Sequence, residues 1–408
     1  DMVPQKNSDK THDFEKDPIK AYVDGDWVTA DGTTLGADNG IGVAAAMAVL
    51  EDKKLKHGPI EVLLTIDEES GMTGAFNLKD DALKGDILLN LDSEDEGELF
   101  IGCAGGMEAN ITMLYTEQEL PAGFDAFNLA LTGLKGGHSG LDIHLERGNA
   151  NKLLNRFLRM AEHNFEMRLC CFNGGSLRNA IPREAFCKVV VPRDKIDAFK
   201  KKTEEYEQLL KNEYGDVEPD LSFKYEPTDV PEKTMGLPGQ TALIDAIHAM
   251  PNGVMRMSTS MQGLVETSTN LAVVKTKDGQ VYMQALLRSA VDSAKRDLGA
   301  MIHAIVSMAG GEVEFAGEYP GWKPNVNSPI LKQMQNIYEK EFGKIPEIKA
   351  LHAGLETGLL GNLYPNMDMI SFGPTIRYPH SPDEKIHIGS VEKFYTLLVK
   401  TLENIEKK

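Results

Sequence analysis

Apolar and polar positions alternate along the first hundred residues in blocks that predict short buried strands and amphipathic helices. The apolar runs at residues 60–66 and 87–91 are typical of buried strands. The run of small and apolar residues at 41–52 predicts a helix, and a second helix is expected at 74–83. Strands and helices that follow one another in this way favour an α/β fold with a mostly parallel sheet flanked by helices.

The pattern changes near residue 109, where longer strands and strongly amphipathic helices follow. The helices of this region are expected at residues 146–163, 194–214, 241–250 and 292–308. Strand–helix–strand patterns occur on both sides of a polar linker at 216–238, which suggests two duplicated halves. After residue 318 the alternation of helix and strand resumes. We therefore expect a discontinuous catalytic domain at 1–108 and 318–408, with an α+β lid domain inserted at 109–317.

Acidic residues follow the predicted strands of the first region. Asp67, Glu68 and Glu69 come after the run at 60–66, Asp92 follows the next strand, and Asp38 precedes the first helix. The carboxyl ends of parallel strands are where ligands bind in α/β sheets. Carboxylates gathered there are tolerable around metal ions or when partly protonated. For residues 67–69 taken alone, a solvated acidic turn is the alternative.

His380 lies far downstream in a proline-stiffened loop at residues 373–384. An imidazole combined with carboxylates is a ligand set that suits zinc. Considered alone, His380 is typical of a histidine in a surface loop. The sequence therefore predicts a metal site only if the fold brings this loop to the acidic residues.

Composition and charge narrow the classes of partner. The formal net charge of −19 over 408 residues argues against nucleic acid and anionic membranes. No apolar run approaches the roughly 20 residues that a membrane helix needs. The four cysteines show neither disulfide-framework nor CxxC spacing, which favours a reducing compartment.

Eight motifs, in order along essentially the whole chain, resemble those of one peptidase family. They are DMVPQK at 1–6, LGADNG at 35–40, DEESG at 67–71, LDSE at 91–94, GGHSG at 136–140, RNAIPR at 178–183, HAGLE at 352–356 and PHSPDE at 379–384. The chain is similar to the aminoacyl-histidine dipeptidases, also called cytosolic non-specific dipeptidases. These belong to the co-catalytic zinc peptidases that include carnosinases and carboxypeptidase G-like enzymes.

The resemblance implies a cytoplasmic enzyme that hydrolyses unblocked dipeptides, Xaa-His and others, with a metal-activated water. It implies two Zn²⁺ ions per active site, with Mn²⁺ or Co²⁺ as substitutes. The partner would be the dipeptide substrate, without nucleic acid or membrane, and a homodimer through the lid domain is left open.

The resemblance also implies the roles of the metal ligands and of the base. Asp38 would bridge the two zinc ions, Glu69 and His380 would complete one site, and Asp92 would contribute to the other. Glu68, next to a ligand, would be the general base.

Four further residues acquire a role from the same resemblance. His138 would stabilise the oxyanion of the tetrahedral intermediate. Asn179 would contact the substrate, and Arg288 would bind the terminal carboxylate of the substrate. Asp1 would orient a metal-bound histidine, as the last residue of a His-x-Asp motif. On the residues alone, His138 and Asn179 are also typical of turns, and Arg288 of a surface ion pair.

Two alternatives stay open at this point. The sequence begins at Asp1, after the histidine of the His-x-Asp motif, which predicts an N-terminal truncation and an incomplete second zinc site. A catalytically impaired or non-catalytic binding member of the same scaffold is therefore one alternative. The other is a Mg²⁺-dependent phosphoryl-transfer enzyme, which the acidic charge and the absence of a phosphate loop disfavour. A metal preference for Mg²⁺ over Zn²⁺ or Mn²⁺ would favour it.

Overall fold

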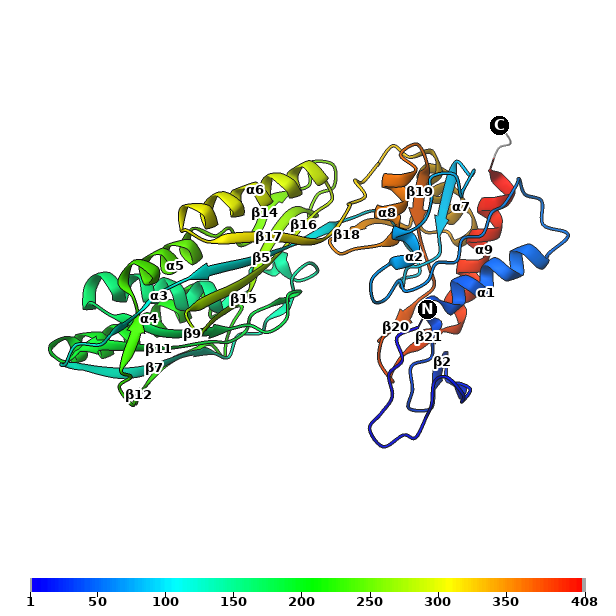
Figure 1. Cartoon of the computed structure of the whole chain (residues 1–408). Helices are drawn as coiled ribbons and strands as arrows, with labels where there is room; N and C mark the ends of the chain where they lie inside the picture. The colour runs from blue at the N-terminus through cyan, green and yellow to red at the C-terminus, as the bar shows by residue number, and fades with distance from the viewer. Residues whose placement is uncertain (1, 406–408) are drawn as a thin grey trace. The chain divides into compact units, whose positions relative to one another are not determined.

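The computed structural model describes residues 2–405 and divides into two compact units (Figure 1). Unit 1 comprises Asp1–Cys103 and Gly321–Lys408, and unit 2 comprises Ala104–Pro320. These divisions lie close to the boundaries expected after residues 108 and 317. Unit 2 is thus an insertion between the two segments of unit 1.

Unit 1 is a mixed α/β structure around a four-stranded sheet. The sheet has the order β18-β4-β19-β3, and its strands are β3 (Ile87–Asn90), β4 (Glu98–Cys103), β18 (Glu347–Leu351) and β19 (Asp368–Ser371). The pairs β18–β4 and β19–β3 are parallel, and the single contact between β19 and β4 is antiparallel. Its main helices are α1 (Ala37–Glu51), α7 (Pro329–Phe342), α8 (Glu356–Leu363) and α9 (Ile388–Asn404).

A second small sheet in unit 1 joins the two ends of the chain. Its order is β1-β2-β21-β20, with β1 (Ala21–Asp24), β2 (Trp27–Ala30), β20 (Ile376–Arg377) and β21 (Lys385–His387). The strands β20 and β21 pair through Ile376 and Ile386, which are buried together with Ala37 at the start of α1. The loop between β20 and β21 carries His380 and is therefore held against the start of α1.

The strand predicted at residues 60–66 was wrong. The segment has no helix or strand and forms no ladder with another strand among residues 2–405, and Leu64 and Ile66 are 61% and 70% exposed. An apolar run becomes a strand only when another strand offers its backbone groups. The helix expected at 74–83 is reduced to the single turn α2 (Thr73–Phe76). The Asn77 side chain donates to the carbonyl of Thr73 and competes with continued helix.

Unit 2 is built on one long antiparallel sheet with four helices packed along it (Figure 1). The sheet has the order β12-β7-β11-β9-β15-β16-β5-β17, and β14 pairs with β15. Its strands are β5 (Gly105–Leu114), β7 (Phe124–Thr132), β9 (Arg168–Gly174), β11 (Ala185–Pro192), β12 (Ser222–Thr228), β14 (Gly253–Met257), β15 (Val265–Lys277), β16 (Gln280–Ser289) and β17 (Glu312–Tyr319). The strands of both predicted halves thus join one sheet.

The helices of unit 2 cover this sheet with apolar faces. They are α3 (Ala150–Phe165), α4 (Ile196–Tyr214), α5 (Leu237–Ala249) and α6 (Asp292–Met308). On α3, Leu154, Phe157, Leu158 and Ala161 are fully buried at helical spacing. Short pairs β8 (Gly137–His138) with β10 (Ala180–Ile181), and β6 (Glu117–Glu119) with β13 (Lys233–Met235), complete the unit.

One further prediction in this region was wrong. The linker expected at 216–238 contains β12 and β13. In β12 the apolar Phe223 and Tyr225 alternate with Lys224 and Glu226, which is the pattern of an edge strand with one solvated face. In the part of the chain that the structure describes, no helix is both long and apolar enough to cross a membrane.

Candidate metal centre and substrate-binding residues

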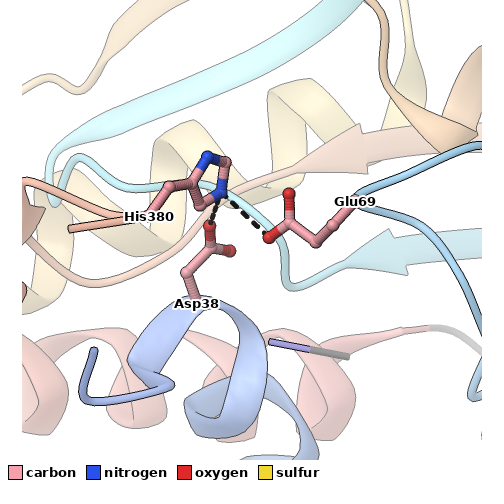
Figure 2. Close-up of side chains that lie close together, drawn as sticks. All are labelled: Asp38, Glu69 and His380. Atoms are coloured by element: carbon pink, nitrogen blue, oxygen red, sulfur yellow. Dashed lines mark hydrogen bonds and ion pairs between the residues drawn. The ribbon is translucent and has the colours of Figure 1, made fainter. Parts of the chain in front are cut away.

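Asp38, Glu69 and His380 meet in unit 1, although they come from three separate segments (Figure 2). The Nε2 atom of His380 lies 3.2 Å from Oδ2 of Asp38 and 3.0 Å from Oε1 of Glu69. Ligands at about 2.0–2.2 Å from a tetrahedral zinc ion are roughly 3.3–3.5 Å from one another. One imidazole and two carboxylates are therefore gathered with close to the spacing of a zinc site.

Local structure holds two of the three side chains, those of Asp38 and His380, in place. Asp38 lies at the start of α1, and His380 has a left-handed backbone (φ 60°) in the loop between β20 and β21. The carboxylate of Glu384, on the same loop as His380, is buried and accepts hydrogen bonds from the backbone N–H groups of Leu35, Gly36 and Asp38, at 2.7, 2.8 and 3.1 Å. Glu384 therefore ties the His380 loop to the segment that carries Asp38.

Further carboxylates surround this cluster within unit 1. Asp38, Glu68, Glu69, Asp92 and Glu356 line one cavity of about 1170 Å³. Burial, reinforced by the neighbouring carboxylates, raises the pKa of Asp92 well above its usual value. Burial and the charge of Glu69 raise the pKa of Glu68 to about 7. Carboxylates held together at this cost are the donor set that a bound cation stabilises.

The charges on the three clustered residues respond to one another. Burial disfavours the charged form of His380, but Glu69 and Asp38 outweigh burial and raise its pKa. Burial and the charge of Asp38 raise the pKa of Glu69, although His380 acts in the opposite direction. The raised pKa favours the protonated form of His380, whose positive charge partly neutralises the two carboxylates.

Glu68 differs from its neighbour Glu69 in what it contacts. Glu69 turns toward His380 and joins the three-residue cluster, whereas Glu68 lines the same cavity from outside that cluster. Glu356 also lines the cavity, and its Oε2 accepts a hydrogen bond from the hydroxyl of Thr65 at 2.8 Å. The sequence therefore placed two adjacent glutamates here, and the fold gives them separate surroundings.

His138, Asn179 and Arg288 lie together in unit 2. The pairing of β8 with β10 sets His138 opposite Ala180, and the backbone carbonyl of Asn179 accepts from Ser139 N–H at 2.8 Å. Nη2 of Arg288 lies 3.5 Å from Nε2 of His138, and Arg288 is 5% exposed. The alternatives, a turn for His138 and a surface ion pair for Arg288, are therefore not met, because His138 lies in β8 and Arg288 is buried. Asn179 lies in a turn and is exposed.

The hydrogen bonds of His138 define which ring nitrogen carries the proton. Its Nδ1 accepts from the backbone N–H groups of Gly140 and Leu141, at 3.2 and 3.0 Å. Burial and the charge of Arg288 lower the pKa of His138, which favours the neutral ring. The neutral ring then carries its proton on Nε2. Nε2 of His138 and Nη2 of Arg288 are consequently two donors side by side, and they suit an acceptor such as an oxyanion or a carboxylate.

Asp1, expected to orient a metal-bound histidine, lies outside the described residues. Glu384 is the site residue that sequence reasoning missed, although it belongs to the PHSPDE motif. Its signal was an acidic residue at the end of a proline-rich loop that also carries His380, the candidate metal ligand. Its partners, about 350 positions earlier in the chain, could not be identified from the sequence.

The chain is similar to known peptidases along its whole length. Residues 1–404 match the family described as "Peptidase family M20/M25/M40". The chain is 49% identical over 408 residues to the cytosol non-specific dipeptidase of Escherichia coli K12. The alignment covers 100% of this chain and 84% of that protein. It is 52% identical to the aminoacylhistidine dipeptidase of Vibrio alginolyticus, whose crystal structure superposes with a TM-score of 0.96 over 100% of this chain and 83% of that one.

A more distant structure shows the same fold at low sequence identity. The aminopeptidase PepT of Bacillus cereus is 17% identical, with a TM-score of 0.56 over 95% of this chain and 77% of that one. The family resemblance that the eight motifs indicated is confirmed by the full-length matches. The chain belongs to peptidase family M20/M25/M40, and is thus a hydrolase acting on peptide bonds.

Proposed function

We propose that this protein is a cytoplasmic metallodipeptidase that hydrolyses unblocked dipeptides, including Xaa-His. The observation that carries the proposal is the cluster of Asp38, Glu69 and His380 beside Glu68 in one cavity. The names of the similar proteins from E. coli and V. alginolyticus, both dipeptidases, support the choice of substrate.

The residues of the cluster fit Zn²⁺. An imidazole nitrogen and two carboxylate oxygens, all within 4.8 Å of one another, provide the donor types and the spacing that zinc prefers. Asp38 would hold two ions, Glu69 and His380 would bind one of them, and Asp92 the other. When bound, such ions polarise the scissile carbonyl and make a water molecule more acidic.

Glu68 is the residue that moves the proton. Glu69 is engaged with His380, and the carboxylate of Glu68, which lines the same cavity, would accept a proton from the attacking water. It then delivers this proton to the nitrogen of the leaving amine. The half-buried position of Glu68 suits both steps, because burial raises its basicity while the neighbouring carboxylates disfavour a second negative charge.

His138, Arg288 and Asn179 would bind the polar groups of the dipeptide. The Nε2–H of neutral His138 donates to the oxyanion that develops on the carbonyl, and the guanidinium of Arg288 binds the free terminal carboxylate. The buried position of Arg288 strengthens its pairing with an anion. Asn179 adds an exposed amide next to His138.

The other readings have less support. A phosphoryl-transfer enzyme disagrees with membership of a peptidase family. None of the similar proteins named above favours an impaired or non-catalytic member, and Glu68 lines the same cavity as Asp38 and Glu69.

The proposal is tested by assaying the purified protein with and without metal. A free Xaa-His dipeptide is incubated with protein supplied with Zn²⁺ or Mn²⁺, and the released amino acids are quantified by chromatography. We expect hydrolysis that is abolished by EDTA and restored by added metal, and poor hydrolysis of the N-acetylated dipeptide. Hydrolysis that persists after complete removal of metal would contradict the proposal.

A further inference from the structure

Arg288 has polar neighbours that leave its positive charge uncompensated. In the described part of the chain, its Nη1 donates to the phenol oxygen of Tyr319 at 3.3 Å, and its Nη2 lies 3.5 Å from His138. Its Nε is covered and has no partner among the same residues. A phenol and a neutral imidazole contact a cation without neutralising it. A buried guanidinium with such neighbours can bind an anionic ligand.

The register of three neighbouring strands brings Tyr319 to Arg288. Gly106 on β5 lies opposite Arg288 on β16 and also opposite Tyr319 on β17. A Cβ atom at Gly106 would lie 2.5 Å from Cε1 and 2.7 Å from the hydroxyl oxygen of Tyr319. Because Gly106 has no side chain, the tyrosine ring lies across the central strand and its hydroxyl reaches the guanidinium.

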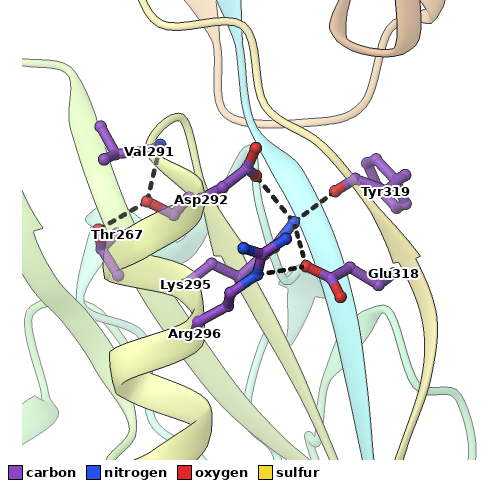
Figure 3. Close-up of polar contacts among 8 residues, drawn as sticks. Thr267, Val291, Asp292, Lys295, Arg296, Glu318 and Tyr319 are labelled. Atoms are coloured by element: carbon purple, nitrogen blue, oxygen red, sulfur yellow. Dashed lines mark hydrogen bonds and ion pairs between the residues drawn. The ribbon is translucent and has the colours of Figure 1, made fainter. Parts of the chain in front are cut away.

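A buried lysine fixes the backbone of Tyr319. The side chain of Lys295 on α6 is fully buried, and its Nζ donates to the carbonyl oxygen of Tyr319 at 2.5 Å and to Oδ1 of Asp292 at 3.0 Å (Figure 3). Glu318 lies 3.5 Å from the same Nζ. A buried ammonium needs such partners, and removal of one of them would destabilise the fold. Lys295 therefore anchors the end of β17 to the helix.

Ser289, the residue after Arg288, is held by hydrogen bonds to Thr267 and Val291. The hydroxyl of Ser289 is hydrogen-bonded to that of Thr267 at 2.9 Å and accepts from the N–H of Val291 at 3.1 Å. Both strands that carry the contact, β16 and β17, are thus fixed at the position where Arg288 and Tyr319 meet. The phenol oxygen consequently has a defined place relative to the guanidinium.

We propose that Tyr319 is a positioning residue for substrate binding. Its hydroxyl accepts from one Nη of Arg288 and fixes the plane of the guanidinium, while leaving the positive charge available to the free carboxylate of the dipeptide. This inference rests on the proposed function of Arg288. A carboxylate in place of the phenol would pair with the arginine and compete with the substrate, whereas a tyrosine orients without competing.

The test is a comparison of Tyr319→Phe with Tyr282→Phe on the same sheet. Both variants lose only a hydroxyl, and the Tyr282 hydroxyl contacts Asn110 instead of Arg288. For Tyr319→Phe we expect KM for a free dipeptide to rise about tenfold, as for loss of a hydrogen bond to a charged group, with kcat little changed. The value of kcat/KM for the C-terminally amidated dipeptide should stay at that of the parent, and Tyr282→Phe should match the parent with both substrates.

A third variant, Arg288→Met, separates failure of this inference from failure of the proposed function. If Arg288→Met abolishes the preference for a free carboxylate and Tyr319→Phe leaves KM unchanged, the positioning role is refuted while the function of Arg288 stands. If Arg288→Met keeps the preference, the proposed function of Arg288 itself is wrong. Equal losses of Tyr319→Phe with free and amidated substrates, or a loss in kcat alone, would show a merely structural role.

Discussion

Replacement of Glu68 by glutamine is the most informative change at the metal centre. Glutamine has nearly the same shape as glutamate, so the cavity lined by Glu68, Glu69 and Asp92 should keep its form. The side chain loses its ability to accept a proton, while Asp38, Glu69 and His380 are unaltered. We therefore expect zinc binding to persist and dipeptide hydrolysis to be lost.

The size of the expected loss follows from the role of a general base. Proton transfer by a positioned side chain contributes about 10²–10⁴ in rate. This corresponds to about 2.7–5.4 kcal/mol of activation free energy. The matched control is Glu61→Gln, because Glu61 lines the same cavity but accepts from the backbone N–H groups of Lys84 and Gly85. Its amide oxygen can continue to do so.

Although Glu68→Gln should lose activity, it should increase the stability of the metal-free protein. Burial and the charge of Glu69 raise the pKa of Glu68 from 4.5 to about 7, so its ionisation destabilises the folded state. Over that interval, about 1.4 kcal/mol per pH unit gives roughly 3 kcal/mol, which solvent screening of a partly exposed group reduces to about 1–2 kcal/mol. This destabilisation is complete above the folded pKa, decreases as pH falls from 7, and is absent below 4.5. In EDTA at pH 8, Glu68→Gln should therefore be the more stable protein.

Three measurements on the parent, Glu68→Gln and Glu61→Gln decide the question. Zinc content is measured by elemental analysis, hydrolysis of a free Xaa-His dipeptide by chromatography, and unfolding in EDTA by urea titration at pH 5 and pH 8. Hydrolysis by Glu68→Gln at the rate of the parent, with equal zinc content, would refute the assignment of the base. A variant less stable than the parent at pH 8 would refute the description of its electrostatic surroundings.

The remaining predictions concern His380 and Glu384 at the candidate metal centre, and Arg288 among the substrate-binding residues. His380→Ala should weaken zinc binding by more than the roughly 10–100-fold that is typical of residues that hydrogen-bond to a metal ligand. Replacement of the exposed His303 by alanine should leave zinc affinity unchanged. Equal zinc affinities of His380→Ala and the parent, measured by calorimetry, would exclude His380 as a ligand. Glu384→Gln, which loses the charge that three backbone N–H groups face, should weaken zinc binding about 10–100-fold, and an unchanged affinity would show that the loop is held by other contacts. Amidation of the dipeptide should lower kcat/KM roughly 10–100-fold through Arg288, and comparable values for free and amidated substrates would contradict that role.

The helices with strong periodicity were predictable from local pattern. The helix expected at 292–308 is observed at Asp292–Met308, and that expected at 194–214 is observed at Ile196–Tyr214. In both, apolar residues recur at helical spacing and the buried faces follow from this spacing. The structure of residues 60–66 did not follow from their apolar pattern, because a strand depends on a partner that the run itself does not contain.

By itself, the sequence determined the chemical types at the candidate metal centre and the family, since carboxylates, an imidazole and eight ordered motifs are local features. Only the tertiary structure decided which of these groups meet. Glu384 binds the backbone at Asp38 across 346 positions, and the strand register brings Tyr319 beside Arg288 over Gly106. The physical reason is that local periodicity fixes which face of an element is apolar, whereas contacts between distant residues depend on how the elements pack and pair.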